Sequence, residues 1–287
     1  MSRSRVGSAV LSAAVLSAAA LLFLTTACGG GGGGTQAAGN CTPKHQFSTI
    51  EKGTLTVGVY DLPPYAMTTG PDGMSGVDAD ILREIAKREC LTITAQAGNT
   101  ASLIPSVQQG RADLAIGDWY RTVDRSKVVN LSDPLYLDQM GIVSDAGLSS
   151  VTELQGKKVG TVDGYLWVSD LQQVLGDSLR LYPSAVDMNQ DLKAGRIEVG
   201  VDSYGSALFT HKGTAEKVLV TQPDDRVAAS KEAAQATFPM AKDNQDMLKA
   251  FNETIAELHK DGTITKVLEA NGLPASAEQT GAPRLIP

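Results

Sequence analysis

Strand patterns and helix patterns alternate along the chain from residue 54 onward, and this alternation constrains the fold more than any other feature. The segment "TLTVGVY" (54–60) places Leu55, Val57 and Val59 on one face of a strand. Next come a helical pattern in "GVDADILREIAKREC" (76–90), a strand in "LTITAQ" (91–96), a helix in "ASLIPSVQQG" (101–110) and a strand in "ADLAIG" (112–117). Such alternation predicts a parallel or mixed α/β sheet.

The same alternation starts again after residue 150. Strands are predicted at 158–164, 179–184, 196–202 and 216–222, with helices between them. Two apolar extended segments, 139–145 and 233–243, border this second unit, and the helix after them carries an apolar stripe that includes Phe251 and Ile255. We expect that helix to return to the first unit. The prediction is therefore two lobes joined by two hinge strands: residues 45–138 with 242–287, and residues 139–241.

The N-terminus is typical of an export signal. Arg3 and Arg5 precede a nearly uncharged stretch rich in Ala, Leu and Ser, which ends in "LTTAC" at Cys28. A single membrane-spanning helix is the alternative interpretation. The end of this segment resembles the lipobox of bacterial lipoproteins, which predicts a signal peptide at 1–28 and lipidation of Cys28. The glycine-rich residues 29–44 then form a flexible tether, and the folded body lies outside the cytoplasm, anchored to the outer face of the membrane.

Charge and cysteine content narrow the class of protein further. The formal net charge of −7 argues against nucleic acid as a partner. Cys41 and Cys90 remain once Cys28 is assigned, and an exported chain enters an oxidising compartment, so a disulfide is expected, with two separate buried thiols as the alternative. The three histidines lie outside any nucleophile or metal motif, so no catalytic residue, metal or cofactor is predicted.

A weak internal echo marks two strand ends. "QGRADLAIGD" (109–118) and "AGRIEVGVD" (194–202) each contain Gly-Arg, an apolar strand and a final Asp. A helix end, a short turn and a buried strand would explain the echo without a shared function. Yet Asp118 and Asp202 both follow strands, at the edge where open α/β sheets place their ligands.

Six blocks of the sequence resemble, in order, those of the family 3 extracellular solute-binding proteins, the amino-acid receptors of ABC importers. They are "GTLTVGVYDLPPY", "GMSGVDADILREIAKR", "LIPSVQQGRADLAIG", "RTVDRSKVVNLSDPLY", "LQGKKVGTVDG" and "AELHKDGTITKVLEANG", between about residues 48 and 274. The resemblance implies a type II periplasmic-binding-protein fold, the Venus flytrap, which closes on a small molecule.

The resemblance also implies particular ligand contacts. The family's binding segment falls on Gly117, Tyr120, Thr122 and Arg125, with the arginine on the α-carboxylate, and Asp202 would meet the α-ammonium. A guanidinium matches a carboxylate with paired donors, and an enclosed ammonium needs an anion. The alternatives are an Arg125 paired with Asp124, Asp133 or solvent, and capping roles for Thr122 and Asp202.

The segment "DWYR" departs from the small hydroxyl residues of the family. If Asp118 faces the cleft, the pocket favours a ligand with a cationic or multiply donating side chain; pairing of Asp118 with Arg121 is the alternative. Several aromatic residues follow predicted strands and suit a pocket that stacks on its ligand. The further candidates are Tyr60, Tyr65, Trp119 and Tyr165, with Asp61 and Asp163 as weaker ones, whereas Trp167 is expected in the core.

The sequence therefore predicts a monomeric, membrane-tethered receptor that binds a small amino-acid-like molecule and delivers it to an ABC permease. An enzyme on the same fold, like the cyclohexadienyl dehydratases, is the alternative, and Asp118 is the feature that favours it. A ligand-sensing module for a signalling partner is a third interpretation.

Overall fold

The computed structural model describes residues 41–287. The predicted signal peptide, Cys28 and nearly all of the predicted tether lie outside these residues. Within 41–287, no helix has both the length and the apolar character needed to cross a membrane.

The first lobe is built around a five-stranded sheet in which β1 (Thr54–Tyr60) runs parallel to both β2 (Thr92–Gly98) and β3 (Leu114–Ile116). The strand order is β2-β1-β3-β13-β5, with β13 (Pro239–Met240) antiparallel to β3 and to β5 (Asn130–Leu131). Five helices belong to this lobe: α1 (Val77–Arg88), α2 (Thr100–Gln108), α3 (Val123–Val128), α7 (Gln245–Lys260) and α8 (Thr263–Ala270).

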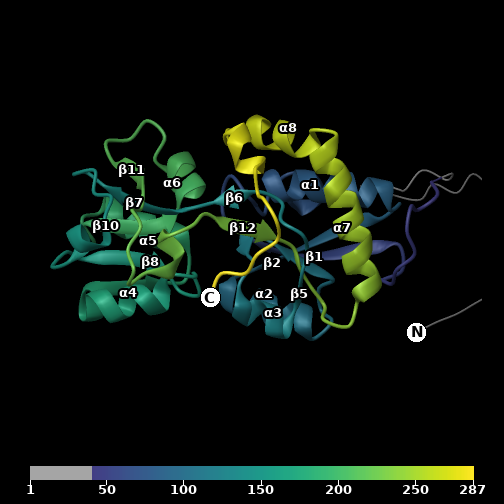
Figure 1. Ribbon diagram of the computed structural model, residues 1–287, viewed down its shortest axis with the longest axis horizontal. Helices are drawn as coiled ribbons and strands as arrows, with labels where there is room; N and C mark the ends of the chain where they lie inside the picture. The colour runs from purple at the N-terminus through teal and green to yellow at the C-terminus, as the bar shows by residue number, and fades with distance from the viewer. Residues whose placement is uncertain (1–40) are drawn as a thin grey trace, which may run out of the picture. The chain divides into compact units, whose positions relative to one another are not determined.

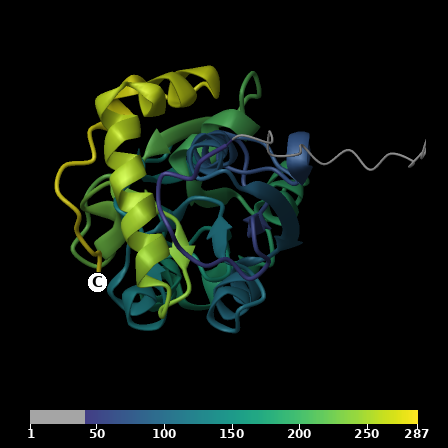
Figure 2. The ribbon, with the colours of Figure 1, turned by 90° about the vertical axis from the view of Figure 1, so that its right-hand side faces the viewer.

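The apolar stripe of α7 packs into the first lobe. Met247, Phe251, Ile255 and Leu258 are buried in the same core as Leu55 of β1. Figures 1 and 2 show α7 and α8 together along one side of this lobe. The chain thus returns to its first lobe after it has built the second.

The second lobe contains another five-stranded sheet, in the order β11-β7-β10-β8-β9. Its strands are β7 (Met140–Ser144), β8 (Val159–Val162), β9 (Leu179–Tyr182), β10 (Val199–Ser203) and β11 (Lys217–Val220), and β10 runs parallel to β8 and antiparallel to β7. The helices are α4 (Val168–Leu175), α5 (Ala185–Lys193) and α6 (Tyr204–Thr210). Single 3₁₀ turns occur at Pro71–Gly73, Val151–Leu154, Gly176–Ser178, Ala228–Ser230 and Ala275–Glu278.

A third, small sheet lies where the chain passes between the lobes, and we call it the connecting sheet. It consists of β4 (Trp119–Tyr120), β12 (Ala234–Thr237) and β6 (Leu137–Asp138), all antiparallel (Figure 1). Each of the two predicted crossing segments begins at or beside this sheet. The second of them continues into β13, so its last part pairs within the first-lobe sheet. Their action as hinges stays a prediction.

A disulfide joins Cys41 to Cys90, with 5.8 Å between the two Cα atoms. Cys90 lies just after α1, so the bond holds the start of the described chain against the end of that helix.

Candidate functional site

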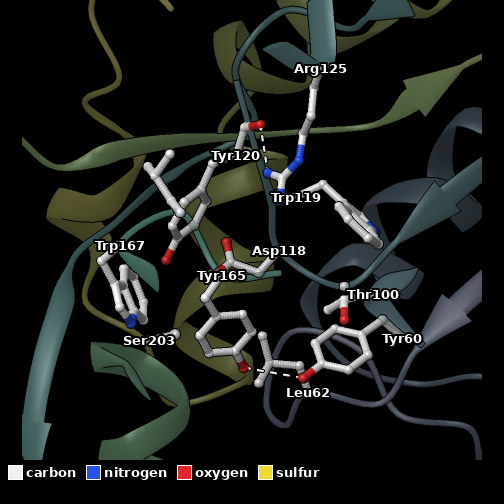
Figure 3. A pocket seen from close by; sticks show the side chains of 12 residues that line it. Tyr60, Leu62, Thr100, Asp118, Trp119, Tyr120, Arg125, Tyr165, Trp167 and Ser203 are labelled. Carbon is white, nitrogen blue, oxygen red and sulfur yellow. Dashed lines mark hydrogen bonds between the residues drawn. The ribbon is translucent and has the colours of Figure 1, made fainter. Parts of the chain in front are cut away.

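A cleft lies between the two lobes (Figure 3). It is lined by Tyr60, Leu62, Thr100, Gly117, Asp118, Trp119, Tyr120, Arg125, Tyr165, Leu166, Trp167 and Ser203. Tyr60 ends β1, Leu62 comes just after it, and Thr100 comes just after β2. The lining residues from Gly117 to Arg125 follow β3, and the remaining four come from the second lobe. The strand ends of both sheets therefore face one site.

The turn after β3 is held in an unusual backbone conformation. Gly117 has φ of 126°, and a Cβ atom there would lie 2.7 Å from the Cβ of Tyr60, so only glycine fits. Asp118 follows with φ of 54°. The carboxylate of Asp78, in the first turn of α1, accepts hydrogen bonds from the backbone N–H groups of Gly117 (2.8 Å) and Asp118 (2.9 Å) and from the hydroxyl of Tyr136 (2.6 Å). This buried acid fixes the turn that presents Asp118.

Asp118 brings a buried carboxyl group into the cleft. Its exposed fraction is 7%, and neither of its oxygens has a hydrogen-bond partner within residues 41–287. Burial raises the pKa of Asp118 well above its usual range, and the nearby charges of Asp138 and Asp78 raise it further. Two free acceptors in a buried position are costly unless a donor reaches them.

Arg125 approaches the same cleft from α3. Its Nη1 donates to the carbonyl of Tyr120 at 3.0 Å, and its guanidinium lies 4.9 Å from the centre of the Trp119 ring (Figure 3). Burial lowers the pKa of Arg125 to about 10, against the opposing effect of Tyr120 and Asp118, so the guanidinium stays charged at neutral pH. A half-buried planar cation of this kind is suited to a carboxylate.

Thr122 supports Arg125 from behind rather than lining the cleft. It is the N-cap of α3, and its hydroxyl accepts a hydrogen bond from the backbone N–H of Arg125 at 3.1 Å. The Thr122 hydroxyl is thus arranged as a helix cap, which is the alternative role considered for this residue.

Asp202 lies in β10, next to the lining residue Ser203, and is fully buried. One carboxylate oxygen accepts from the backbone N–H of Ser203 at 2.8 Å, and the other has no partner in the described part of the chain. Burial raises the pKa of Asp202 to about 7, and the hydrogen bond from the backbone N–H of Ser203 acts against this rise. Asp202 therefore lies just behind the cleft wall formed by Ser203 and Tyr165.

Five of the twelve residues that line the cleft are aromatic. Tyr60 lies 6.5 Å from Trp119 and 6.5 Å from Tyr165, measured between ring centres, and Tyr165 lies 5.1 Å from Trp167. Trp167 is 1% exposed and packs in the second-lobe core as expected, but one face of it also lines the cleft. Its indole N–H donates to the hydroxyl of Thr161 at 2.8 Å. The wall suits a ligand with a flat or extended apolar part.

Two contacts join the lobes across the cleft. The Thr100 hydroxyl donates to the backbone carbonyl of Asp163 at 2.8 Å, and the hydroxyls of Tyr60 and Tyr165 lie 3.2 Å apart. Asp163 thus contributes a carbonyl at the rim. We call these two contacts the latch, because both need the lobes close together.

Three residues considered with the site point elsewhere. Tyr65 stacks on Tyr136 at 5.3 Å and donates to Asp138 at 2.6 Å, so it supports the connecting sheet. Asp61 accepts from the Thr68 hydroxyl at 3.1 Å and lies outside the cleft lining. Arg121 donates to the carbonyls of Leu131 and Ser132, so it does not form the pair with Asp118 that the sequence left open.

Four lining residues were missed from the sequence: Leu62, Thr100, Leu166 and Ser203. Thr100 comes two residues after β2 and Ser203 ends β10, so the strand-end rule applied to every strand would have marked both. Leu62 comes two residues after β1 and would have been marked in the same way, whereas Leu166 lies further from the end of β8 and carries no such signal. Within residues 41–287 there is no group of three or more His, Cys, Asp or Glu side chains placed to hold a metal ion.

Two α/β lobes, connecting strands and a cleft between the lobes define the class: a two-lobed protein with the type II periplasmic-binding-protein fold. Residues 55–272 match the family described as "Bacterial extracellular solute-binding proteins, family 3", and the chain belongs to this family. Both the family resemblance and the fold class predicted from the sequence are confirmed.

Relatives of known name cover most of the chain. It is 28% identical over 225 residues to the "L-cystine-binding protein TcyJ" of Escherichia coli (strain K12), which covers 76% of this chain and 82% of that protein. It is 25% identical over 241 residues to the "Arginine-binding extracellular protein ArtP" of Bacillus subtilis (strain 168), covering 81% and 91%. The solved structure of an ancestral arginine-binding protein bound to arginine has a TM-score of 0.68 at 25% identity, covering 77% of this chain and 99% of that chain.

Proposed function

We propose that the protein is a solute receptor that binds a small amino-acid-like molecule between its lobes and delivers it to an ABC import permease. The observation that carries the proposal is the cleft itself: the half-buried Arg125 of the first lobe lines it, and the buried, incompletely bonded Asp202 of the second lobe lies behind its wall. The named relatives are also amino-acid-binding proteins.

The polar groups of the cleft fit a zwitterion. Arg125 binds the carboxylate of the ligand. Asp202, which lies next to the lining residue Ser203, binds its ammonium group. Each lobe supplies one of these partners, so both ends of the ligand are satisfied only when the lobes are closed. A ligand that gains such contacts in one state alone shifts the equilibrium toward that state.

Asp118 adds a second acidic group, and we infer from it that the ligand carries a second cationic or multiply donating group. Its two oxygens have no partner in the described structure, so a donor-rich side chain would remove the cost of burying them. The aromatic wall would hold the apolar part of such a side chain. The relative named as arginine-binding supports this class of ligand.

A thermal-shift screen of residues 40–287 against amino acids tests the proposal. At least one amino acid should raise the melting temperature, with the basic ones strongest, and Asp118→Asn should reduce the preference for basic over neutral amino acids. If no zwitterionic compound shifts the melting temperature, the assignment of a carboxylate site and an ammonium site is wrong.

An enzyme on the same fold is the second candidate, and the observation that favours it is the buried carboxyl group of Asp118, whose pKa burial raises well above its usual range. A dehydratase-like enzyme should convert prephenate or arogenate when the pure protein is incubated with either. We expect no turnover of either compound, and measurable conversion would favour the enzyme.

We also propose that the receptor acts as a monomer held at the outer face of the membrane by a lipid on Cys28, with residues 29–40 as the tether, which is shorter than the predicted 29–44 because the disulfide fixes Cys41 to Cys90. Cys28→Ala should move the protein from the membrane fraction to the soluble fraction. Continued incorporation of labelled fatty acid by this variant would rule out Cys28 as the lipidation site.

A further inference from the structure

The last eight residues of the chain, 280–287, form a segment that we call the tail, and it lies beyond the family match, which ends at residue 272. Its backbone pairs with the segment that carries the ligand site. The N–H of Ile286 donates to the carbonyl of Arg121 at 3.0 Å, and the N–H of Val123 donates to the carbonyl of Ile286 at 2.9 Å. These two hydrogen bonds flank Thr122, the cap of the helix that presents Arg125.

A buried glutamine fixes the tail to the connecting sheet. Gln235 of β12 is 1% exposed, and its side-chain N–H₂ donates to the carbonyls of Thr280 (2.9 Å) and Ala282 (2.8 Å). Its side-chain carbonyl accepts from the N–H of Arg284 at 2.8 Å, and its backbone carbonyl accepts from the N–H of Arg121 at 2.9 Å. One residue of β12 thus binds both the tail and the site segment.

The tail ends in the core of the second lobe. Ile286 is 7% exposed and belongs to the cluster that contains Tyr120, Met140 and Ala234, whereas the neighbouring Leu285 is 41% exposed. The tail begins after a 3₁₀ turn beside α8 of the first lobe, and Figure 1 shows it passing the connecting sheet toward the C-terminus. It is therefore a third stretch of chain that links the lobes, in addition to the two predicted hinge strands.

We infer that the tail is a positioning element of the ligand site: it holds Tyr120 and the start of α3, and through them Arg125, in the geometry needed for binding with the lobes closed. The choice of ligand in the test rests on the proposed function. The claim that the tail positions the site segment does not. Ile286 and Gln235 act through the site segment, because neither lines the cleft.

The two tryptophans of the chain, Trp119 and Trp167, both line the cleft, so their emission reports on the site directly. The test uses the full chain, a tail-less chain that ends at Gln279, and Ile286→Ala, with Leu285→Ala as the matched control because that neighbouring side chain is 41% exposed. Acrylamide quenching is measured without ligand, and affinity is measured by calorimetry with L-arginine as the probe.

The tail-less chain and Ile286→Ala should both show stronger acrylamide quenching than the full chain. Their affinity for L-arginine should fall by about tenfold or more, because a site that is correctly arranged for only a fraction of the time binds in proportion to that fraction. Leu285→Ala should match the full chain in both measurements.

Wild-type quenching and wild-type affinity in Ile286→Ala would overturn the inference, and so would equal effects of Ile286→Ala and Leu285→Ala. If the tail-less chain fails to fold, Ile286→Ala decides alone. If L-arginine does not bind even the full chain, L-arginine is not its ligand, and the quenching comparison still decides the role of the tail.

Discussion

Arg125 and Asp118 line the same cleft, a cationic and an acidic side chain, yet no ion pair joins them in the described structure. Arg125 is engaged by Trp119 and by the carbonyl of Tyr120, and Asp118 is held apart from it by the turn that Asp78 fixes. Keeping the two side chains apart leaves each of them available to a ligand. Direct pairing would instead have satisfied both without one.

Replacement of Arg125 tests the carboxylate contact. Arg125→Ala should weaken amino-acid binding by about 2 kcal/mol or more, because it removes a charged partner from a desolvated carboxylate. Calorimetry measures the change. Arg125→Lys is the matched control and should recover only part of the affinity, since a lysine cannot donate in a planar pair. Unchanged affinity in Arg125→Ala would remove this residue from the site.

Asp202 predicts a pH dependence of binding. Its pKa of about 7 in the empty protein means that it is largely protonated below pH 7, whereas the ligand ammonium needs the ionised form. Affinity should therefore fall as the pH is lowered from 8 to 6, by at most about tenfold per unit, and Asp202→Asn should show a flatter profile with weaker binding. Equal affinity of the wild type at both pH values would contradict the contact.

The same raised pKa has a consequence for the empty protein. Its folded state holds the proton of Asp202 more tightly than the unfolded chain does. This contribution to the free energy of unfolding is thus fully present below about pH 4, the range of an ordinary aspartate, and is lost as the pH rises through about 7.

At the scale of the elements, the sequence predicted strands and helices better than it predicted what their ends do. Alternating apolar residues such as Leu55, Val57 and Val59 mark β1 because a half-buried strand needs them, and the stripe with Phe251 marks α7 in the same way. Asp118 was placed at a strand end from its position alone. The direction of its side chain could not be predicted, because it depends on the turn held by Asp78, 40 residues earlier in the chain.

One contact of the latch, from Thr100 at the start of α2 to Asp163 after β8, should control how long a ligand stays bound. Thr100→Val keeps the shape of the side chain but removes the hydroxyl that donates to the carbonyl of Asp163. It should raise the dissociation rate by about fivefold, in line with about 1 kcal/mol for one such hydrogen bond, and change the association rate less. Stopped-flow tryptophan fluorescence measures both rates. Thr100→Ser, which keeps the hydroxyl, should behave as the wild type.

At the scale of the whole molecule, six blocks of sequence in the order of one family were enough to predict the two-lobed fold, and the family match over residues 55–272 confirms it. The site was predictable to the extent that it follows strand ends, which is why Tyr60, Asp118 and Tyr165 were found. What depends on contacts between distant segments was not predictable. Two examples are the hydrogen bond from Thr100 to Asp163 and the hydrogen bonds from Gln235 to the tail, because neither produces a local pattern in the sequence.

The central claim is that an amino acid binds in the cleft between the lobes, with its carboxylate on Arg125. Titration of the intrinsic tryptophan emission of residues 40–287 with individual amino acids tests it most directly, since both tryptophans line the cleft. We predict a saturable change with at least one basic amino acid that is weakened or lost in Arg125→Ala. No change with any amino acid, or the same binding curve in Arg125→Ala, would contradict the claim.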